Sequence, residues 1–212
     1  MIYETASHLR SDAWAATADV DTLRQYLLDL FCQLAYQEGD FTLSSGQRSS
    51  YYINGKQVSL HPQGALAIGR ILLSELPTDT QAVAGLTLGA DPIVSAVSVV
   101  SAYEDRPIPA LIVRKEPKGH GTRAYIEGPS LPSGSLVVVL EDVVTTGQSA
   151  LKAVERLRQV GYRVNQVMAL VDRQQGGAEL YQSAGLKFQC VFSIPEIQER
   201  FRQRRAGEQV GR

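Results

Sequence analysis

Two neighbouring carboxylates and a short run of hydroxyl residues form the part of this sequence best suited to chemistry. The acids are Glu141 and Asp142, and after a pair of valines come Thr145, Thr146, Gly147, Gln148 and Ser149. Hydroxyl groups can donate hydrogen bonds to phosphate oxygens, and glycine lets the backbone come close to them. Carboxylates repel phosphate and instead suit vicinal hydroxyls or a hydrated divalent cation. A ribose 5-phosphate satisfies both demands, so the segment predicts a sugar-phosphate site.

The elements on either side of this segment must position it. Residues 136–140 are consecutive apolar, mostly β-branched residues, which predicts a strand buried on both faces of a parallel sheet. From Ala150 to Val160 apolar residues recur at helical spacing, and Gly161 ends the pattern. The first amides of such a helix lack internal partners and lie at the positive end of its dipole, so they bind anions readily. The acids then stand at the sheet edge where α/β proteins bind ligands.

An ordinary loop is the main alternative for this segment. In that case Glu141 and Asp142 are solvent-facing acids, and the Thr-Thr-Gly sequence is a common helix cap. A nucleotide P-loop is a further rival, but it requires the pattern G-x-x-x-x-G-K-[ST], which the sequence does not contain.

The segment V-V-V-L-E-D-V-V-T-T-G-Q-S resembles the phosphoribosyl pyrophosphate (PRPP) signature of the type I phosphoribosyltransferases. Two further stretches are similar to the orotate phosphoribosyltransferases within that group: F-T-L-S-S-G-Q-R-S-S-Y-Y-I-N-G-K at residues 41–56 and V-R-K-E-P-K-G-H-G at residues 113–121. The resemblance covers about residues 40–177. It implies a small N-terminal hood over the active site and transfer of ribose 5-phosphate from PRPP to orotate, which yields orotidine 5′-monophosphate and pyrophosphate in pyrimidine nucleotide synthesis.

The resemblance also assigns roles to individual residues. Those expected to be catalytic are Lys118, Glu141 and Asp142. Those expected to bind PRPP are Arg114, Lys115, Lys118, His120, Glu141, Asp142, Val143, Val144, Thr145, Thr146, Gly147, Gln148 and Ser149. Those expected to bind orotate are Thr145, Arg173, Tyr51 and Tyr52. Mg²⁺ is the expected cofactor, held mainly by PRPP near the two acids.

A loop that carries several cations follows the strand expected at residues 108–113. It contains Arg114, Lys115, Lys118 and His120 and reaches about residue 132. Loops of about 15 residues without apolar periodicity are uncommon unless they are functional or disordered. A pyrophosphate leaving group needs such cations, because negative charge grows on its departing oxygen. The alternative is a solvated charge run. In relatives this loop reaches into the partner subunit's site, which implies a homodimer with shared sites.

The sequence departs from the resembled family at two positions where members carry lysine. Ser44 replaces one of these lysines, and Arg48 or Lys56 is a possible substitute. Gly89 replaces the other, which leaves the backbone amides of residues 88–90 to contact the pyrophosphate. The site residues outside the PRPP segment have plainer interpretations too: a simple strand-to-helix turn capped by Asp91, two tyrosines that pack on opposite faces of a strand, and an Arg173 that forms a salt bridge.

Strands that alternate with helices from residue 81 to residue 171 predict an α/β fold with a doubly wound parallel sheet flanked by helices. We expect one domain over residues 1–212, with a loose arm at 1–18, the hood at about 40–60 and a frayed tail at about 205–212. The expected strands are 81–86, 108–113, 136–140, 164–171 and 186–192, with a hairpin within 41–58. The expected helices are 21–36, with Asp19 or Asp21 as N-cap and Gly39 as its stop, then 61–76, a helix ending near 102, 150–160 and 196–204.

The overall composition bounds the remaining possibilities. A net charge of −1 argues against a general nucleic-acid or membrane surface. Cys32 and Cys190 are far apart and lack metal-ligand spacing, so we expect reduced thiols. No apolar run approaches the roughly 20 residues that span a bilayer, and no signal-peptide core is evident. We therefore expect a cytoplasmic protein.

Two other functions are compatible with the PRPP-like segment. A phosphoribosyltransferase for another base differs only in its base contacts. A PRPP-sensing regulator that binds RNA or DNA needs a basic stripe, which the near-neutral charge disfavours.

Overall fold

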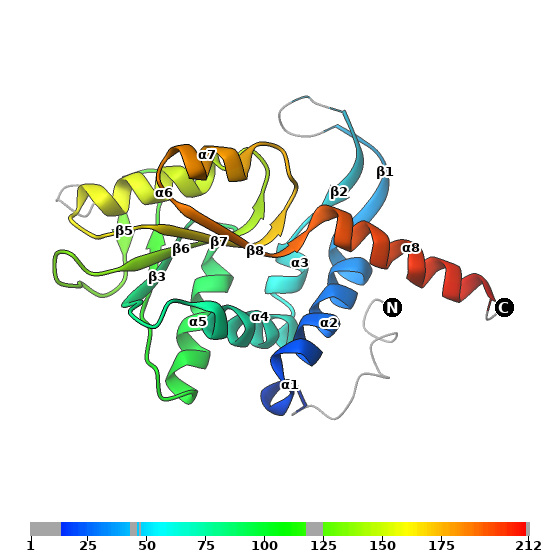
Figure 1. Ribbon diagram of the computed structural model, residues 1–212, viewed down its shortest axis with the longest axis horizontal. Coiled ribbons are helices and arrows are strands. Elements are labelled where there is room, and N and C mark those ends of the chain that lie inside the picture. The colour runs from blue at the N-terminus through cyan, green and yellow to red at the C-terminus, as the bar shows by residue number, and fades with distance from the viewer. Residues whose placement is uncertain (1–13, 43–45, 47, 118–124, 211–212) are drawn as a thin grey trace.

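The computed structural model describes residues 14–42, 46, 48–117 and 125–210, with side chains as far as residue 207. Here six strands form one sheet with the order β5-β4-β3-β6-β7-β8, and two form a separate hairpin (Figure 1). The strands are β1 Tyr36–Thr42, β2 Arg48–Ile53, β3 Ala82–Leu86, β4 Ala110–Val113, β5 Ile126–Glu127, β6 Val137–Val144, β7 Gln166–Asp172 and β8 Lys187–Ser193. The helices are α1 Trp14–Thr17, α2 Val20–Leu30, α3 Lys56–Ser59, α4 Pro62–Glu75, α5 Asp91–Tyr103, α6 Gln148–Gln159, α7 Gly177–Ser183 and α8 Ile194–Val210, with a π-helical turn η2 at Phe31–Ala35.

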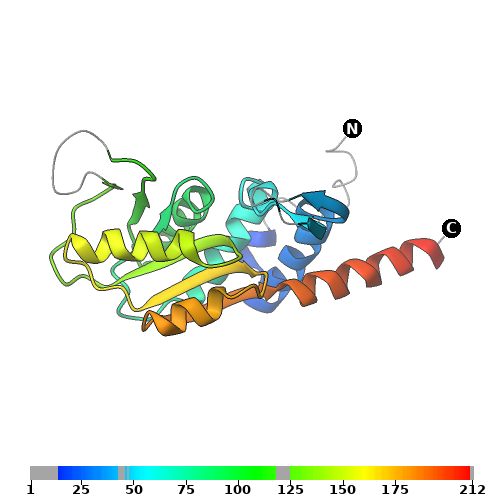
Figure 2. The same ribbon diagram turned by 90° about the horizontal axis from the view of Figure 1, so that it is seen from above.

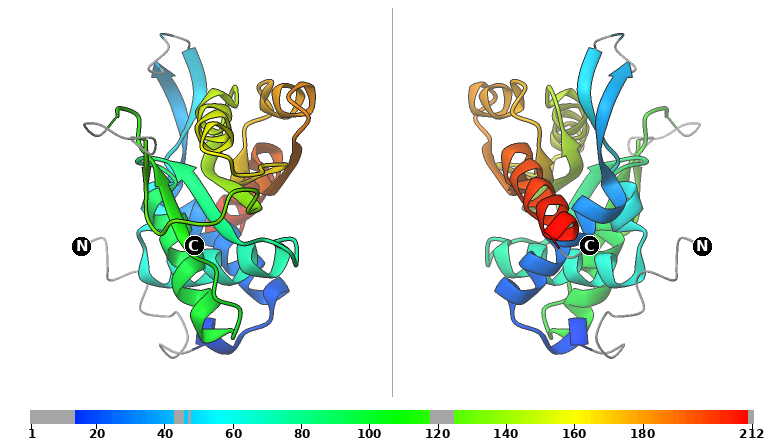
Figure 3. Two further views of the ribbon diagram at one scale, coloured as in Figure 1. Left: turned by 90° about the vertical axis from the view of Figure 1, so that its left-hand side faces the viewer. Right: turned by 90° about the vertical axis from the view of Figure 1, so that its right-hand side faces the viewer.

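The six-stranded sheet is parallel apart from β5, which pairs antiparallel with β4. Helices α2, α4 and α5 cover one face, and α6 and α7 cover the other (Figure 3). In β6, Val138 and Leu140 face the first layer while Val137 and Val139 face the second, because successive side chains point to opposite faces of a strand. A central strand buried in this way is apolar on both sides. The expected doubly wound α/β fold is confirmed.

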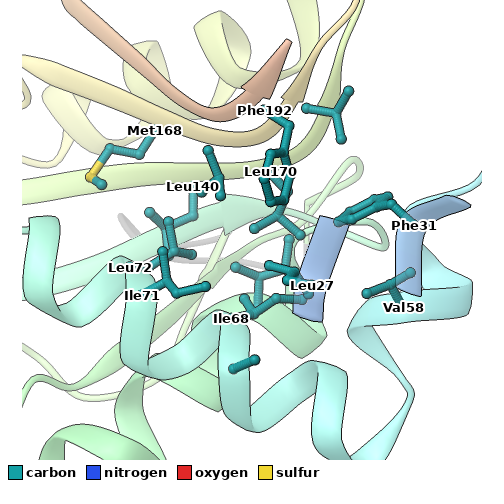
Figure 4. Packing of buried hydrophobic residues seen from close by; sticks show 14 of the residues in the cluster. Leu27, Phe31, Val58, Ile68, Ile71, Leu72, Leu140, Met168, Leu170 and Phe192 are labelled. Carbon is teal, nitrogen blue, oxygen red and sulfur yellow. The ribbon is translucent and has the colours of Figure 1, made fainter. Parts of the chain in front are cut away.

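Apolar side chains pack between the sheet and α4 and hold the strands in place. Leu140 and Met168 of the sheet face Ile68, Ile71 and Leu72 of α4 (Figure 4). None of these five side chains is more than 1% exposed. Since burying one such side chain contributes about 1.5–3 kcal/mol, this layer gives the strands a rigid base from which their carboxyl ends project.

The direction of the chain across the sheet reverses between β3 and β6. β3 leads into α5 on one face and then into β4, whereas β6 leads into α6 on the opposite face and then into β7. Ligands of open α/β sheets bind outside the carboxyl ends of the strands at such a switch point. The loops that follow β3 and β6 therefore border one crevice, as the sequence predicted.

β6 is longer than the predicted strand at 136–140. It pairs with β7 as far as Val144, and the pairs include Glu141 with Ala169 and Val143 with Val171. The predicted end of the strand at Leu140 was wrong, because Val143 and Val144 continue the β-branched pattern beyond the acids. The backbone that carries the two carboxylates is therefore part of the strand that pairs with β7 rather than part of a turn.

The first long helix is shorter than the predicted range 21–36. Asp19 is its N-cap, as expected, and accepts a hydrogen bond from a backbone amide of the first turn. The helix gives way to a π-helical turn, and Tyr36 already begins β1. Gly39 lies inside β1, so its assignment as a helix stop was wrong. Tyr36 joins the hairpin because its buried ring stacks on that of Tyr51 in β2, with the ring centroids 5.8 Å apart.

The described part of the expected N-terminal arm is packed against the domain. Residues 14–17 form α1, in which Ala15 is fully buried. The ring of Trp14 meets that of Tyr26 edge-on, with the centroids 4.7 Å apart. A loose arm was therefore the wrong prediction for residues 14–18, while residues 1–13 lie outside the described chain.

The predicted frayed tail is instead the end of one continuous helix. α8 runs from Ile194 to Val210 and extends away from the body of the molecule (Figure 2). Arg200 and Arg204 both bind the carboxylate of Asp29, at 2.8 Å and 3.0 Å. These contacts anchor the middle of α8, and the helix continues beyond residue 204, where the sequence suggested that it would stop.

Three further short elements, α3, β5 and α7, were not expected from the sequence. β5 lies within the cation-bearing loop and forms one edge of the sheet.

Both cysteines are free thiols, and burial raises the pKa of each to about 11. Among the described helices, none combines the length and the apolar character that crossing a membrane requires.

Candidate active site

The turn between β6 and α6, residues 145–149, has the form expected of an anion site. Gly147 adopts the left-handed conformation with φ of 81° and precedes the first residue of α6. Because the N-cap residue is this glycine, no side-chain cap forms at this end of the helix within the described chain. Its amides therefore keep the capacity to bind an anion. Thr146, Gln148 and Ser149 are exposed along the turn, and Thr145 is half-buried.

Glycine is needed at position 147 for contact as well as for conformation. A Cβ atom there would lie 3.0 Å from the ring of Tyr181 and 3.2 Å from the Cα atom of Gly177. Tyr181 is fully buried, and among the described residues its hydroxyl group has no hydrogen-bond partner. Burial raises the pKa of Tyr181, and the charges of Glu141 and Asp172 raise it further.

The turn, Glu141 and Tyr181 line a cavity of about 80 Å³. Tyr181 did not figure in the sequence analysis. It lies on α7, which was itself not predicted, and its spacing in the sequence does not relate it to the turn. Only the folding of α7 beside α6 brings its ring against Gly147.

Glu141 and Asp142 are both buried, at 6% and 8% exposure. Oε1 of Glu141 accepts a hydrogen bond from the amide of Asp142 at 3.3 Å, while Oε2 has no partner within the described chain. Burial raises the pKa of Glu141 well above its usual value, and the neighbouring charge of Asp142 raises it further. The Lys115 ammonium partly opposes this shift, which places Lys115 within electrostatic reach of the acid pair.

Asp142 is enclosed by the loops on the opposite side of the strand from Tyr181. Its Oδ1 accepts a hydrogen bond from the amide of Val143 at 2.9 Å, and its Oδ2 lies 3.8 Å from Nζ of Lys56. A Cβ atom on Gly89 would lie 2.5 Å from Oδ1 of Asp142, and one on Gly55 would lie 3.2 Å from its Cβ atom. The loop after β3 therefore approaches Asp142 with bare backbone and leaves no room for a side chain at position 89.

The two proposed substitutes for the missing lysine lie in different places. Lys56 contacts Asp142 and so belongs to the site. Arg48 instead forms an exposed ion pair with Asp40 across the hairpin. Ser44 lies outside the described residues. Of the two cations, only Lys56 is near the acids.

Arg173 and Tyr51 meet beside the turn although they are far apart in the sequence. Nε of Arg173 donates to the hydroxyl group of Tyr51 at 3.0 Å, and the guanidinium carbon lies 4.8 Å from the centre of that ring. The backbone amide of Arg173 donates to the carbonyl of Val144, which places it next to the end of β6. Arg173 is 9% exposed, and its Nη2 has no partner in the described part of the chain. Arg173 therefore holds an unused donor at the edge of the crevice.

Tyr52 points away from this pair. It is 43% exposed, and its ring packs on Phe41 with the centroids 5.6 Å apart. Neighbouring residues of a strand face opposite sides, so Tyr51 joins Arg173 while Tyr52 lies on the outer surface of the hairpin.

The cation-bearing segment begins at the end of β4. Nη1 of Arg114 lies 3.2 Å from Oε1 of Glu127. Arg114, Lys115 and Thr87 contribute to the walls of a cavity of about 430 Å³. The cavity thus lies between the loop after β3 and the first cations of the segment. Lys118 and His120 lie outside the described residues.

The acid pair is compatible with Mg²⁺ that takes most of its ligands from a substrate. Among the described residues, no three side chains of His, Cys, Asp or Glu are grouped as a metal site. Mg²⁺ commonly binds to one or two carboxylates while phosphates and water supply its other ligands. Glu141 and Asp142 match that donor set.

The chain is 76% identical over 203 residues to the orotate phosphoribosyltransferase of Nostoc sp., and the match covers 96% of this chain and 98% of the relative. The solved orotate phosphoribosyltransferase of Mycobacterium tuberculosis in complex with Fe(III) dicitrate is 38% identical, with a TM-score of 0.75, over 82% of this chain and 98% of that one. The M. tuberculosis enzyme in complex with PRPP is 36% identical, with a TM-score of 0.70, over 83% of this chain and 99% of that one. No family model matches the chain. The fold, the turn and these relatives agree, and the chain belongs to the orotate phosphoribosyltransferase family.

Proposed function

We propose that the turn at 145–149 holds the 5-phosphate of PRPP while Glu141 and Asp142 bind the hydroxyl groups of its ribose. The activity of the family is the transfer of ribose 5-phosphate from PRPP to orotate, with release of pyrophosphate. The observation that carries the assignment is the amino end of α6, which has no side-chain cap among the described residues and follows the buried acid pair after one short turn. Helix amides attract the phosphate, and the acids accept hydrogen bonds from the sugar.

The pyrophosphate group is assigned to the cavity between the loop after β3 and the end of β4. Lys115 and Arg114 line this space, and the resemblance adds Lys118 and His120. Preorganised cations stabilise the charge that grows on the leaving oxygen. The backbone of residues 88–90 completes this side, because Gly89 brings it against Asp142 without a side chain.

Orotate is assigned to Arg173, Tyr51 and Thr145. A guanidinium group binds a carboxylate through paired donors, and Nη2 of Arg173 is a buried donor that lacks a partner in the described chain. The hydroxyl group of Tyr51 accepts a hydrogen bond from Nε of Arg173 and so orients the guanidinium group. Tyr52 is left out of this assignment because it faces the outer side of the hairpin.

The reaction then requires that the protein position the two substrates and stabilise the charges of the transition state, and it needs no protein nucleophile. Cleavage of the bond between C1 of the ribose and pyrophosphate passes through a state that resembles an oxocarbenium ion, as in other glycosyl transfers. The acids orient the sugar hydroxyls and offset positive charge on the ring, and the cations offset negative charge on pyrophosphate. When bound, Mg²⁺ supplies further neutralisation of the leaving group. Glu141 and Asp142 are the residues near which it would lie.

We extend the proposal to assembly and location. By resemblance, the protein forms a homodimer in which the cation-bearing loop of one subunit reaches the site of the other. Its place is the cytoplasm, where PRPP and orotate are used.

The decisive experiment combines the purified protein with orotate, PRPP and Mg²⁺ and follows the loss of the ultraviolet absorption of orotate. We expect steady consumption of orotate, its arrest by a chelator and its return when excess Mg²⁺ is added. Uracil, hypoxanthine and adenine serve as control acceptors and are expected to be inert. Transfer to one of these bases but not to orotate contradicts the assignment of the base site. Tight binding of RNA that weakens steeply with salt, without any transfer, indicates the regulator instead.

A further inference from the structure

Arg156 connects the helix that begins at the phosphate turn with the segment that carries the first cations. It lies in α6, and its Nη1 donates to the backbone carbonyl of Arg114. Its Nη2 donates to the next carbonyl, that of Lys115, at 2.9 Å. The guanidinium carbon also lies 4.0 Å from the centre of the Tyr125 ring. One side chain therefore fastens three residues that lie on both sides of residues 116–124.

These contacts use the shape of the guanidinium group rather than its charge alone. Its planar fork offers donors that can reach two successive carbonyls, and its flat face can stack on an aromatic ring. The partners are two backbone oxygens and one ring, none of which is a carboxylate. Arg156 thus fixes the backbone of this segment and does not bind the side chains of Arg114 and Lys115, of which Arg114 pairs with Glu127.

The position of Arg156 on α6 gives this contact its significance. Ala153, Val154 and Leu157 of the same helix are fully buried against the sheet, so the helix is a rigid support. Its first turn is the proposed 5-phosphate site, and Arg156 projects from a later turn. PRPP carries its 5-phosphate and its pyrophosphate on opposite sides of one ribose. The two sets of binding groups must therefore be kept at a set separation for the substrate to fit both.

We propose that Arg156 is a positioning residue for PRPP, which holds the backbone of Arg114 and Lys115 to α6 so that their side chains meet the pyrophosphate group. This inference rests on the proposed function of those two cations. Arg156 does not touch the substrate. Its effect is exerted through the residues whose carbonyls it binds.

The test is the steady-state kinetics of the full-length enzyme with Arg156→Gln. We expect the KM for PRPP to rise about tenfold, a usual size for coupling between contacting residues. The KM for orotate stays unchanged, because Arg173 and Tyr51 are not in contact with Arg156. Arg156→Lys keeps the charge but loses the fork, so its KM for PRPP lies between that of the wild type and that of Arg156→Gln. Tyr125→Leu removes only the ring contact and is a second, milder variant if Arg156→Gln does not fold.

Arg158→Gln is the matched control. Arg158 lies on the same helix and its Nη2 also donates to a backbone carbonyl, that of Val164, at 2.6 Å. This carbonyl is outside the cation-bearing segment. The substitution is therefore expected to leave the KM for PRPP at the wild-type value, and a rise equal to that of Arg156→Gln overturns the inference.

A double substitution separates positioning from general stability. If Arg156 acts through Lys115, then Arg156→Gln should add little to the rise in KM for PRPP already caused by Lys115→Ala. If the KM of the double variant rises by the product of the two single-variant factors, the positioning role is overturned. If the assignment of Lys115 to the pyrophosphate group is itself wrong, the pattern differs: Lys115→Ala alone leaves the KM for PRPP unchanged. If Lys115→Ala raises this KM and Arg156→Gln does not, the inference about Arg156 alone is wrong.

Discussion

At the scale of the residue, Arg173 is held in place by its protein contacts on two sides. Its Nε is fixed by the hydroxyl group of Tyr51, its backbone amide by Val144, and its Nη2 is buried without a partner among the described residues. An unpaired buried donor is costly. A carboxylate that enters the crevice relieves that cost, which is the physical basis for assigning orotate to this position.

We predict that Arg173→Ala raises the KM for orotate on the order of 10²-fold and the KM for PRPP much less, because removal of one member of a buried charged pair is expensive. The measurement is initial rates with each substrate varied in turn. Tyr51→Phe is the companion variant, which keeps the ring but frees Nε, and should give a smaller rise in the KM for orotate. A larger effect of Arg173→Ala on PRPP than on orotate contradicts the assignment.

Glu141 makes a second prediction at the scale of the residue. Its pKa is higher in the folded protein than its ordinary value of 4.5. At a pH between these two pKa values, the folded protein keeps a proton that the unfolded chain has lost. The stability that comes from this difference is fully present below about pH 4.5 and is lost as pH rises through the folded pKa. We expect Glu141→Gln to flatten this decline, as measured by urea unfolding at a series of pH values.

Glu155 provides the control for that measurement. It is an exposed carboxylate on α6, and Glu155→Gln makes the same chemical change and is carried through the same series of unfolding measurements. An equal slope in wild type and Glu141→Gln above pH 4.5 contradicts the raised pKa of Glu141.

At the scale of the element, the link from β6 to α6 is a tight turn built on one backbone conformation and one close contact. Gly147 has a positive φ, and the Tyr181 ring leaves little space for a side chain beside it. β6 continues through the acids to Val144, so strand pairing extends almost to the turn. The proposed phosphate turn therefore begins directly at the end of a paired strand.

We predict that Gly147→Ala lowers stability by about 1–3 kcal/mol, since a non-glycine residue is strained in this region, and also raises the KM for PRPP. Gly134→Ala is the control, because Gly134 has a φ of 83° but nothing within 4 Å of an added Cβ atom. It should lose comparable stability and leave the KM for PRPP unchanged. Identical effects of the two substitutions on PRPP would show that the turn holds no substrate.

At the scale of the whole molecule, the topology brings distant segments to one crevice. The loop after β3, the turn after β6 and the loop after β7 all lie at the carboxyl ends of parallel strands, and the hairpin of β1 and β2 supplies Tyr51. If a partner subunit completes each site, then two different inactive variants should complement one another.

We predict that a refolded mixture of Lys118→Ala and Arg173→Ala regains about one quarter of wild-type activity, because about half of the dimers are mixed and each contains one intact shared site. Analytical ultracentrifugation of the wild type is expected to show a dimer. Activity no greater than the sum of the separate variants contradicts sharing of the sites between subunits.

Local patterns in the sequence were sufficient to predict the type of most elements, including the strand and the helix on either side of residues 141–149. The apolar run before Glu141, the glycine at position 147 and the helical spacing after it depend only on neighbouring residues, so they can be read without a structure. The boundaries were less predictable. The continuation of β6 through the acids, the start of β1 at Tyr36 and the packing of residues 14–17 depend on partners that are distant in the sequence.

The sequence by itself thus determined that a buried strand, a glycine turn and a helix surround residues 141–149, because strand burial, turn conformation and helical spacing are local properties. The binding of a sugar phosphate between them stays a prediction. Only the tertiary structure decided which side chains surround that site. It placed Lys56 rather than Arg48 near Asp142, turned Tyr51 rather than Tyr52 toward Arg173, and brought Tyr181 and Arg156 into contact with the turn and the cations. Those choices follow from how the layers pack across the sheet, which no local pattern encodes.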